Sequence, residues 1–219
     1  MRLSAVTLLA GLMSSVSAAP AAAEVHSLDR RLSRQGQKDG FFYSLWADYN
    51  GVSYKNGDKG HFEVNWKKGG NVVAGKGFKP AKGSITFEGS WDCDGNCYLS
   101  VYGWSEDPLV ECYIVENYGT YNPAGSGKKK GSVKVDGSIY DIYVAQRKHA
   151  PSVASANGGI ADFPQYWSIR QDKRFNGTVS TDKHIAAWKS LGLEMGELDE
   201  TILAVEGYFS TGSASFTVT

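Results

Sequence analysis

Apolar and polar residues alternate in short runs over most of this chain, with glycines between the runs. Alternation with a period of two is typical of half-buried β-strands. Short strands separated by frequent turn residues are typical of a sandwich or a jelly roll, so we predict an all-β domain. The expected strands are residues 41–46, 61–66, 84–88, 98–104, 131–135, 138–144, 165–170 and the last fifteen.

One segment departs from this pattern and predicts a single α-helix over residues 180–192. Ser180 or Thr181 can cap its N-terminus, and Ile185, Trp188 and Leu191 follow helical spacing. Gly192 can end it. We expect about three turns, packed on the convex side of a sheet.

The N-terminus reads as a leader rather than as part of the fold. Arg2 precedes an apolar stretch over residues 3–13, and small residues follow at 16–18, which is typical of a secretory signal peptide over 1–19. Residues 20–39 are polar and contain Arg30-Arg31, so they are expected to be a propeptide or a flexible segment. Residues 40–219 are expected to be the functional domain of a secreted, soluble protein.

Charge excludes one class of partner. The chain holds 23 basic and 23 acidic residues, and its only cationic run, residues 128–130, is expected to be a solvated turn. Without a basic stripe, nucleic acid is not an expected partner. We expect no membrane partner either.

The three cysteines allow at most one disulfide within the chain. Cys93 and Cys97 flank a tight-turn sequence and could close a small bridge across a hairpin, or could remain free thiols. A zinc site is not expected, because no second Cys/His pair has suitable spacing. Cys112 is expected to be buried and apolar in role.

Two glutamates interrupt strand-like, aromatic-rich runs that lie far apart in the sequence. Glu111 lies within residues 108–116 and Glu206 within 202–209. Strands normally exclude glutamate, because a charge fits poorly on a half-buried pleat. Two such placements predict carboxylates that face each other across a sugar-binding groove, the minimal equipment for hydrolysing a glycosidic bond.

Alternation also assigns a face to each residue of these two runs. The residues expected to enter the core are Val110, Cys112, Ile114, Leu203 and Val205. The residues expected to line the groove are Glu111, Tyr113, Glu206 and Tyr208. Aromatic faces suit the apolar patches of sugar rings, so stacking candidates are Trp46, Tyr102, Trp104 and Tyr166, although each alone could be an ordinary core residue.

Over residues 40–219 the chain resembles the endo-β-1,4-xylanases of glycoside hydrolase family 11, of fungal type. The resemblance implies a β-jelly roll of two curved antiparallel sheets with a single helix. The motifs that carry it, in the family's order, are Val64-Asn65-Trp66, Gly75-Lys76-Gly77-Phe78, Tyr102-Gly103-Trp104, Pro108-Leu109-Val110-Glu111, Tyr140-Asp141-Ile142-Tyr143, residues 165–171 and Glu206-Gly207-Tyr208.

The resemblance implies roles for the two glutamates. Glu111 would be the nucleophile and Glu206 the acid/base of a retaining mechanism, with carboxyl groups roughly 5–5.5 Å apart. Two close carboxylates resist double ionisation, so the proton should stay on Glu206 until Glu111 becomes an ester. Glu116 lies on the opposite face and is expected to be a bystander.

Other residues carry over from the resemblance as substrate-binding positions. Asn71 would lie beside the acid/base, and an asparagine there implies a near-neutral pH optimum. Residues 149–163 would form the mobile thumb of the family. The remaining implied roles are sugar and nucleophile orientation for Tyr102 and Tyr113, hydroxyl binding for Arg147 and Gln165, stacking for Trp46, the thumb bend for Pro151 and groove lining for Tyr208.

The chain also departs from the family pattern. Cys112 stands where a tyrosine is usual, residues 153–162 are rich in Ala and Gly, residues 194–200 are acidic, and the turn at Cys93–Cys97 is not general in the family. These differences concern core packing, substrate grip and the reducing-side subsites.

The leading hypothesis is a secreted, monomeric endo-1,4-β-xylanase that acts on xylan and xylo-oligosaccharides without a metal or other cofactor. The alternatives are an endoglucanase that acts on β-glucan and a non-catalytic glycan-binding module. A serine or cysteine hydrolase is disfavoured by four scattered histidines and by the lack of a nucleophile elbow. Asn176-Gly177-Thr178 is an N-glycosylation sequon that could be used or unused.

Overall fold

The structure is a computed structural model that describes residues 32–154 and 159–219. The predicted signal peptide over 1–19 and the following segment up to residue 31 lie outside the described residues. The elements of the described part are β1 Leu32–Lys38, β2 Phe41–Ala47, β3 Val52–Asn56, β4 His61–Trp66, β5 Asn71–Phe78, β6 Ile85–Glu106, β7 Leu109–Tyr118, β8 Lys128–Val135, β9 Ser138–Ser152, β10 Gly159–Arg170, β11 Gly177–Val179, α1 Thr181–Ser190 and β12 Thr201–Val218.

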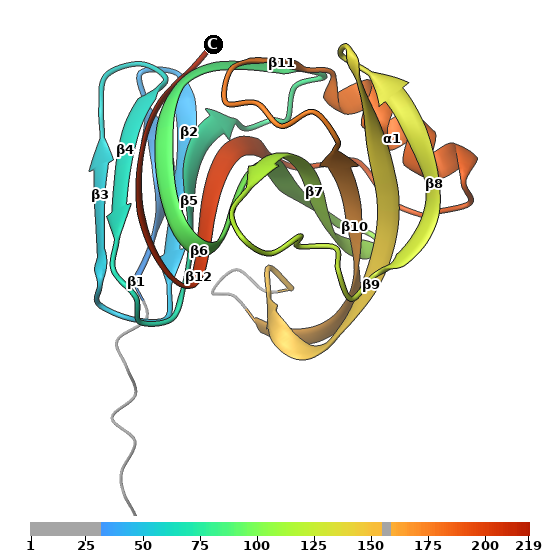
Figure 1. Cartoon of the computed structure of the whole chain (residues 1–219), viewed down its shortest axis with the longest axis horizontal. Helices are drawn as coiled ribbons and strands as arrows, with labels where there is room; N and C mark the ends of the chain where they lie inside the picture. The colour runs from blue at the N-terminus through green and yellow to red at the C-terminus, as the bar shows by residue number, and fades with distance from the viewer. Residues whose placement is uncertain (1–31, 155–158) are drawn as a thin grey trace, which may run out of the picture.

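Nine strands form one continuous path in the order β1-β2-β5-β12-β6-β7-β10-β9-β8. All neighbours on this path are antiparallel except β7 and β10, which are parallel. The strands β3 and β4 branch from β12, and β11 branches from β6. The sheet-dominated architecture with its single described helix confirms the predicted all-β jelly roll (Figure 1).

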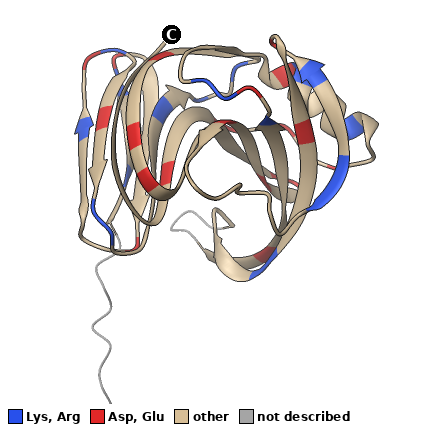
Figure 2. Ribbon diagram, viewed as in Figure 1, with Lys and Arg blue, Asp and Glu red and all other residues tan. Residues whose placement is uncertain are grey.

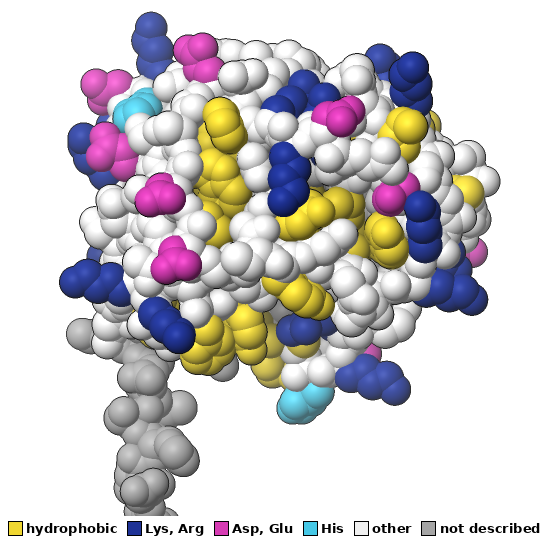
Figure 3. Space-filling view, viewed as in Figure 1, with side chains coloured by type: hydrophobic (Ala, Val, Ile, Leu, Met, Phe, Trp, Pro, Cys, Tyr) yellow, Lys and Arg dark blue, Asp and Glu magenta, His cyan; other side chains and the backbone are white. Residues whose placement is uncertain are grey.

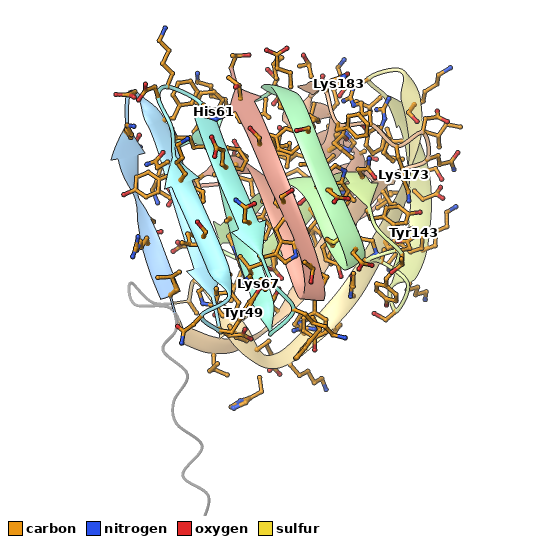
Figure 4. All side chains as sticks on the ribbon, turned by 60° about the vertical axis from the view of Figure 1, so that its left-hand side comes forward. Tyr49, His61, Lys67, Tyr143, Lys173 and Lys183 are labelled. Carbon is orange, nitrogen blue, oxygen red and sulfur yellow. A yellow bond between two sulfur atoms is a disulfide. The ribbon has the colours of Figure 1, made fainter. Side chains whose placement is uncertain are left out.

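Two long strands, β6 and β12, pass from one layer of the jelly roll to the other. Residues 201–208 of β12 pair with β5, whereas residues 212–217 pair with β4. The register between β12 and β6 shifts between Tyr208 and Thr211, at the point of this change. Figure 4 shows the resulting outer layer, in which β3, β4, β12 and β6 lie side by side, with His61 near one end and Tyr49 and Lys67 near the other.

The main hydrophobic core is built as the alternation of the sequence predicted. Val110, Cys112, Ile114, Leu203 and Val205 are all members of this core and all buried. The opposite faces of the same strands hold Glu111 and Glu206 instead. One face of each strand therefore stabilises the fold by burial, while the other remains available for chemistry.

The helix α1 occupies residues 181–190 and packs on the face of β9 and β10 that is turned away from the glutamates. Trp188 is fully buried and donates a hydrogen bond from Nε1 to Ser168 Oγ at 3.0 Å. Ser180 does not cap the helix with its side chain, because its hydroxyl binds Asp136 at 2.8 Å. Gly192 follows the helix with a φ of 73°, a left-handed conformation that glycine adopts without strain.

The structure contains the Cys93–Cys97 disulfide, but the predicted hairpin around it was wrong. Both cysteines lie in β6, and the register shift against β12 falls between them, where Gly95 faces the two residues Phe209 and Ser210 of a bulge in β12. Gly95 has a φ of 112° at this bulge, which a residue with a side chain adopts only with strain. Cys112 is buried, as predicted.

Three other boundaries differ from the sequence prediction. Residues 32–38, inside the segment expected to be processed or flexible, form β1 and pair with β2. The cationic residues 128–130, predicted to be a solvated turn, are the start of the exposed strand β8. The runs 84–88 and 98–104, expected to be separate strands, are parts of the single strand β6.

Charged residues of both signs are interspersed over the visible strands, as Figure 2 shows. Hydrophobic side chains reach the surface on this side in patches separated by polar atoms (Figure 3). Within residues 32–154 and 159–219, no helix is long and apolar enough to cross a membrane.

A buried lysine links the two layers. Lys76 lies on the core face of β5, and its side chain has no exposed surface. Its ammonium donates hydrogen bonds to the carbonyl oxygens of Gly57 at 2.8 Å and His61 at 3.1 Å, and to that of Lys59. Burial lowers the pKa of Lys76. Two of these carbonyls lie in the turn between β3 and β4 and the third is at the first residue of β4, so this one side chain provides hydrogen-bond donors to the whole turn.

Replacing Lys76 by methionine is expected to destabilise the protein by about 1–3 kcal/mol, because the carbonyls lose their donor while still buried. The free energy of unfolding, measured by urea titration, tests this. Lys55→Met is the matched control, since the Lys55 side chain is exposed and pairs only with Glu63. Equal stability of the Lys76 variant and the control would contradict the proposed role of the buried ammonium.

Candidate active site

Four neighbouring strands bring the two glutamates together. Glu206 lies on β12, Tyr102 on β6, Glu111 on β7 and Gln165 on β10. The register sets Glu111 directly beside Gln165 on one side and beside Trp104 on the other. Glu206 and Glu111 are each only 8% exposed. Residues separated by 95 positions in sequence therefore share one partly enclosed site, as the strand faces predicted.

Glu111 is held by three hydrogen-bond donors. Its Oε1 accepts hydrogen bonds from the hydroxyl groups of Tyr102 at 2.9 Å and Tyr113 at 3.0 Å. Its Oε2 accepts one from Gln165 Nε2 at 2.6 Å. The Tyr102 oxygen in turn accepts a hydrogen bond from Trp104 Nε1 at 2.6 Å, which leaves its only proton for Glu111. A carboxyl group surrounded by donors alone is an ionised carboxylate.

The Tyr113 hydroxyl connects the two glutamates directly. It lies 3.0 Å from Glu111 Oε1 and 3.0 Å from Glu206 Oε2. These two carboxyl oxygens are therefore no more than twice that distance apart. A phenol has one hydrogen, so Tyr113 can donate to only one of them. When it donates to the ionised Glu111, the second contact is a hydrogen bond only if Glu206 carries a proton and donates it.

Burial and charge act on the two glutamates unequally. Burial raises the pKa of Glu206, and the nearby charge of Glu111 raises it further, to about 8. Burial also raises the pKa of Glu111, but hydrogen bonds from Gln165, Tyr102 and Tyr113 oppose that rise. The pair therefore holds one proton near neutral pH, and the hydrogen bonds place it on Glu206.

Two further predicted residues act on the charges of this pair. The Asn71 amide and the positive charge of Arg147 both oppose the raised pKa of Glu206. Arg147 also opposes the raised pKa of Glu111. Asn71 lies on the groove face of β5, diagonally across from Glu206, because Glu206 pairs with Val73 and Tyr208 pairs with Asn71. Arg147 lies on β9 beside Phe163.

Aromatic side chains surround the glutamates. Trp167 stacks on Tyr113 with ring centroids 4.0 Å apart and an angle of 9° between the planes. Trp104 contacts Phe163, which belongs to β10, at a centroid distance of 4.8 Å. Phe42 packs with Ile202, Ala204 and Tyr102 on the same side of the sheet. Trp167 and Phe42 were missed by sequence reasoning, although alternation from Gln165 would have placed Trp167 on the groove face.

Three predicted substrate-binding residues lie outside the hydrogen-bonded group that the structure describes around Glu111 and Glu206. Trp46 is partly exposed and pairs with Val73 on the groove side of β2. Tyr208 is 49% exposed and lies two residues beyond Glu206. Pro151 was expected at the bend of the thumb, but it lies in β9 opposite Ile160. The irregular backbone is at His149, which has a φ of 48° and whose N–H binds Asp162 Oδ1 at 2.7 Å. Residues 155–158 of the predicted thumb lie outside the described residues.

The prediction of Tyr166 as a stacking residue was wrong. Tyr166 is 5% exposed, belongs to the main core and donates a hydrogen bond to the Glu194 carbonyl at 2.7 Å. It points away from the groove because its strand neighbour Gln165 points toward Glu111.

Glu116, predicted to be a bystander, is fully buried on the core side of β7. It accepts a hydrogen bond from the Tyr140 hydroxyl at 2.7 Å and forms an ion pair with Arg174. Burial raises its pKa, and the charge of Arg174 opposes that rise. Its contacts anchor the loop that follows β10 and do not involve the two glutamates.

The described residues contain no group of three or more His, Cys, Asp or Glu side chains that could hold a metal ion. From their hydrogen bonds, Glu111 and Glu206 provide one ionised and one protonated carboxyl group, bridged by a single phenol. Such a pair can attack a carbon with one oxygen while it donates a proton with the other.

Comparison with known proteins agrees with this chemistry. Residues 38–217 match the family described as glycosyl hydrolases family 11. The chain is 52% identical to "Endo-1,4-beta-xylanase 1" of Claviceps purpurea, with 98% of each chain covered. It is 45% identical to "Ethylene-inducing xylanase 1" of Verticillium dahliae, with 99% of this chain and 96% of the relative covered. It is 49% identical to "Endo-1,4-beta-xylanase B" of Gibberella zeae, with 87% and 84% covered. A site of two glutamates in a curved β-jelly roll and a match over nearly the whole described chain lead to one conclusion, that this protein belongs to glycosyl hydrolases family 11.

Proposed function

We propose that this protein is an endo-1,4-β-xylanase, which hydrolyses internal bonds of xylan with retention of anomeric configuration. The observation that carries the proposal is the Tyr113 hydroxyl, which lies 3.0 Å from an oxygen of each glutamate. The two contacted oxygens are thus at most about 6 Å apart, which is compatible with the roughly 5–5.5 Å separation of a retaining pair. The names of the relatives above support xylan as the substrate.

In the proposed first step, Glu111 attacks the anomeric carbon and Glu206 gives its proton to the departing oxygen. The three donors around Glu111 stabilise the ionised carboxylate and hold it in one orientation. The C–O bond of the polymer breaks as the ester to Glu111 forms. The charge of Glu111 disappears in this step, so the main charge that raised the pKa of Glu206 is removed.

In the proposed second step, Glu206 acts as a base. Because Glu111 is neutral as the ester, the pKa of Glu206 falls. The Glu206 carboxylate then takes a proton from a water that attacks the anomeric carbon. The bond to Glu111 breaks, which restores one ionised and one protonated glutamate. Two displacements at the same carbon return the original configuration.

We further propose that Trp46, Tyr208 and Pro151 contact the sugar chain beyond the reacting ring. Trp46 is partly exposed on β2, which β5 separates from β12, and Tyr208 is partly exposed on β12 itself. Side chains that stack on sugars must be accessible in this way. Arg147 and Gln165 would bind substrate hydroxyls while they act on the glutamates. Residues 1–19 would direct the chain to secretion, and residues 20–31 would be removed in part or remain as a tail ahead of β1, which pairs with β2 in a monomeric domain.

The substrate proposal is tested by reducing-sugar release from linear xylan and from mixed-linkage β-glucan at equal concentration. We expect release from xylan with xylo-oligosaccharides as products, and little from β-glucan. Proton NMR during hydrolysis of xylohexaose should show the β-anomer first. Faster hydrolysis of β-glucan would favour an endoglucanase, and an initial α-anomer would overturn the retaining mechanism.

The pH profile follows from the pKa of Glu206. Its raised value means that the acid is protonated below about pH 8 and is lost as pH rises through that value. Activity on xylan should therefore be highest near neutral pH and decline above about pH 8. A plot of kcat/KM against pH tests this. An optimum near pH 3 would contradict it.

Asn71→Asp is expected to move the optimum downward. The Asn71 amide donates to Glu206, and an aspartic acid can replace that donor only while it is protonated. Since aspartic acids ordinarily titrate near pH 3.9, the protonated form that can donate to Glu206 would be lost as pH rises through the acidic range. Asn65→Asp, on an exposed position of β4, is the control and should leave the optimum unchanged.

A further inference from the structure

The sequon Asn176-Gly177-Thr178 lies on the surface, where the loop after β10 enters the short strand β11. Asn176 and Thr178 are both exposed, and the neighbouring Phe175 is 48% exposed. No catalytic role has been assigned to this region. The sequence alone left open whether the sequon is used.

The loop is firmly anchored, and its anchors do not use the Asn176 amide. Arg174 pairs with the buried Glu116 and donates a hydrogen bond to the Thr178 carbonyl at 2.8 Å. The Thr178 hydroxyl lies 2.8 Å from that of Thr86, and Gly177–Val179 pairs with the start of β6. The structure therefore presents Asn176 at a defined place and leaves its side chain at the surface.

Asn176 opens onto a surface hollow of about 530 Å³. Its wall is mostly polar and includes His61, Glu88, Ser90, Ser215 and Thr217. His61 marks this end of the outer layer in Figure 4. The hollow is open to solvent, and hydroxyl, carboxylate and imidazole groups suit the hydroxyl and acetamido groups of a sugar.

We propose that Asn176 carries an N-linked oligosaccharide whose first N-acetylglucosamine residues lie in this hollow. The proposal rests on the secretion proposed above, because the donor is a lipid-linked oligosaccharyl diphosphate of the secretory pathway. The Asn176 Nδ2 loses a proton and forms a bond to the anomeric carbon of the sugar. The bond from that carbon to the diphosphate breaks, and the lipid diphosphate leaves.

The modification site is remote from the catalytic residues along the sheet. β11 pairs with residues 85–87 of β6, whereas Tyr102 lies about fifteen residues further along the same strand. At the rise of a β-strand this separation corresponds to a contour of about 50 Å, although the strand is curved. The glycan should therefore leave hydrolysis in the groove unchanged.

The test expresses the full chain in a eukaryotic secretory host and measures the intact mass before and after treatment with peptide-N-glycosidase. We expect a mass loss of one oligosaccharide and conversion of Asn176 to aspartate in the tryptic peptide. Thr178→Ala should abolish the glycan, whereas Thr178→Ser should keep it. Thr86→Ala removes the same hydroxyl contact without touching the sequon, and it should also keep the glycan.

Secreted wild-type protein with an unmodified Asn176 would overturn the proposal. Because every sample is also assayed on xylan, an unglycosylated but active enzyme would refute this inference and leave the proposed function intact. The placement of the sugars is tested by the rate of glycan removal. Slower removal from the folded than from the denatured protein is expected, and equal rates would show that the glycan projects freely from the hollow.

Discussion

Glu111→Gln is expected to lower kcat on xylan by a factor on the order of 10⁴ or more, because removal of a nucleophile from a catalytic group that acts as a unit removes nearly all of its effect. Glutamine keeps the shape of the side chain and can still contact Tyr102 and Tyr113, so the fold should survive. The amide oxygen cannot form the glycosyl ester. Initial rates of reducing-sugar release measure the effect.

Two measurements separate this loss from a general effect of the substitution. Glu106→Gln, on an exposed position at the end of β6, is the matched control and should keep wild-type kcat. A 2-fluoro xyloside with a good leaving group should label the wild-type enzyme at Glu111, as read by mass spectrometry of the peptide, and should not label Glu111→Gln. A label on another residue, or a variant with unchanged turnover, would refute the proposed nucleophile.

Glu206→Gln is expected to lower kcat on xylan by about 10²–10⁴-fold, the usual contribution of a general acid/base. The glutamine cannot protonate the departing sugar and cannot activate water. An aryl xyloside whose leaving group needs no proton should still form the ester with Glu111. The second step would then be slow, so a burst of the aryl alcohol followed by a low steady rate is the expected time course.

Azide provides the decisive check of this role. As a nucleophile that needs no base, it should accelerate turnover of the aryl xyloside by Glu206→Gln and yield a β-xylosyl azide, the product of two displacements. The wild-type rate should change little. The activity of Glu206→Gln should no longer decline above about pH 8, because the raised pKa of Glu206 causes that decline in the wild type. A variant without burst or azide response would show that Glu206 serves another purpose.

The sequence predicted the parts of this site that depend on alternation. Glu111 and Glu206 lie on the groove faces, and Val110, Cys112 and Val205 lie in the core, because a strand exposes alternate residues to alternate sides. The same rule should have excluded Tyr166, since Gln165 lies next to it. That prediction failed because the aromatic composition was given more weight than the strand face.

The sequence could not provide the pairing between distant strands. β5 contains two glycines and a lysine, so its pattern is weak, and its place beside β12 follows only from the register. The assignment of the proton to Glu206 rests on the hydrogen-bond donors to Glu111, which come from three different strands. The continuous path of β6 was also hidden, because the glycine-containing segment between Cys93 and Cys97 looks like the end of a strand, whereas it continues β6 opposite a bulge in β12.

The length of β12 has a consequence for inactivation by heat. This one strand carries Glu206 and, a few residues later, the pairs with β4 that build the outer layer. Local unfolding of the outer layer would therefore displace Glu206, and we expect the outer layer and the active site to unfold together. We expect loss of turnover and loss of near-ultraviolet circular dichroism to follow a single curve with temperature. An enzyme that stops working well below its melting midpoint would indicate instead that the thumb fails first.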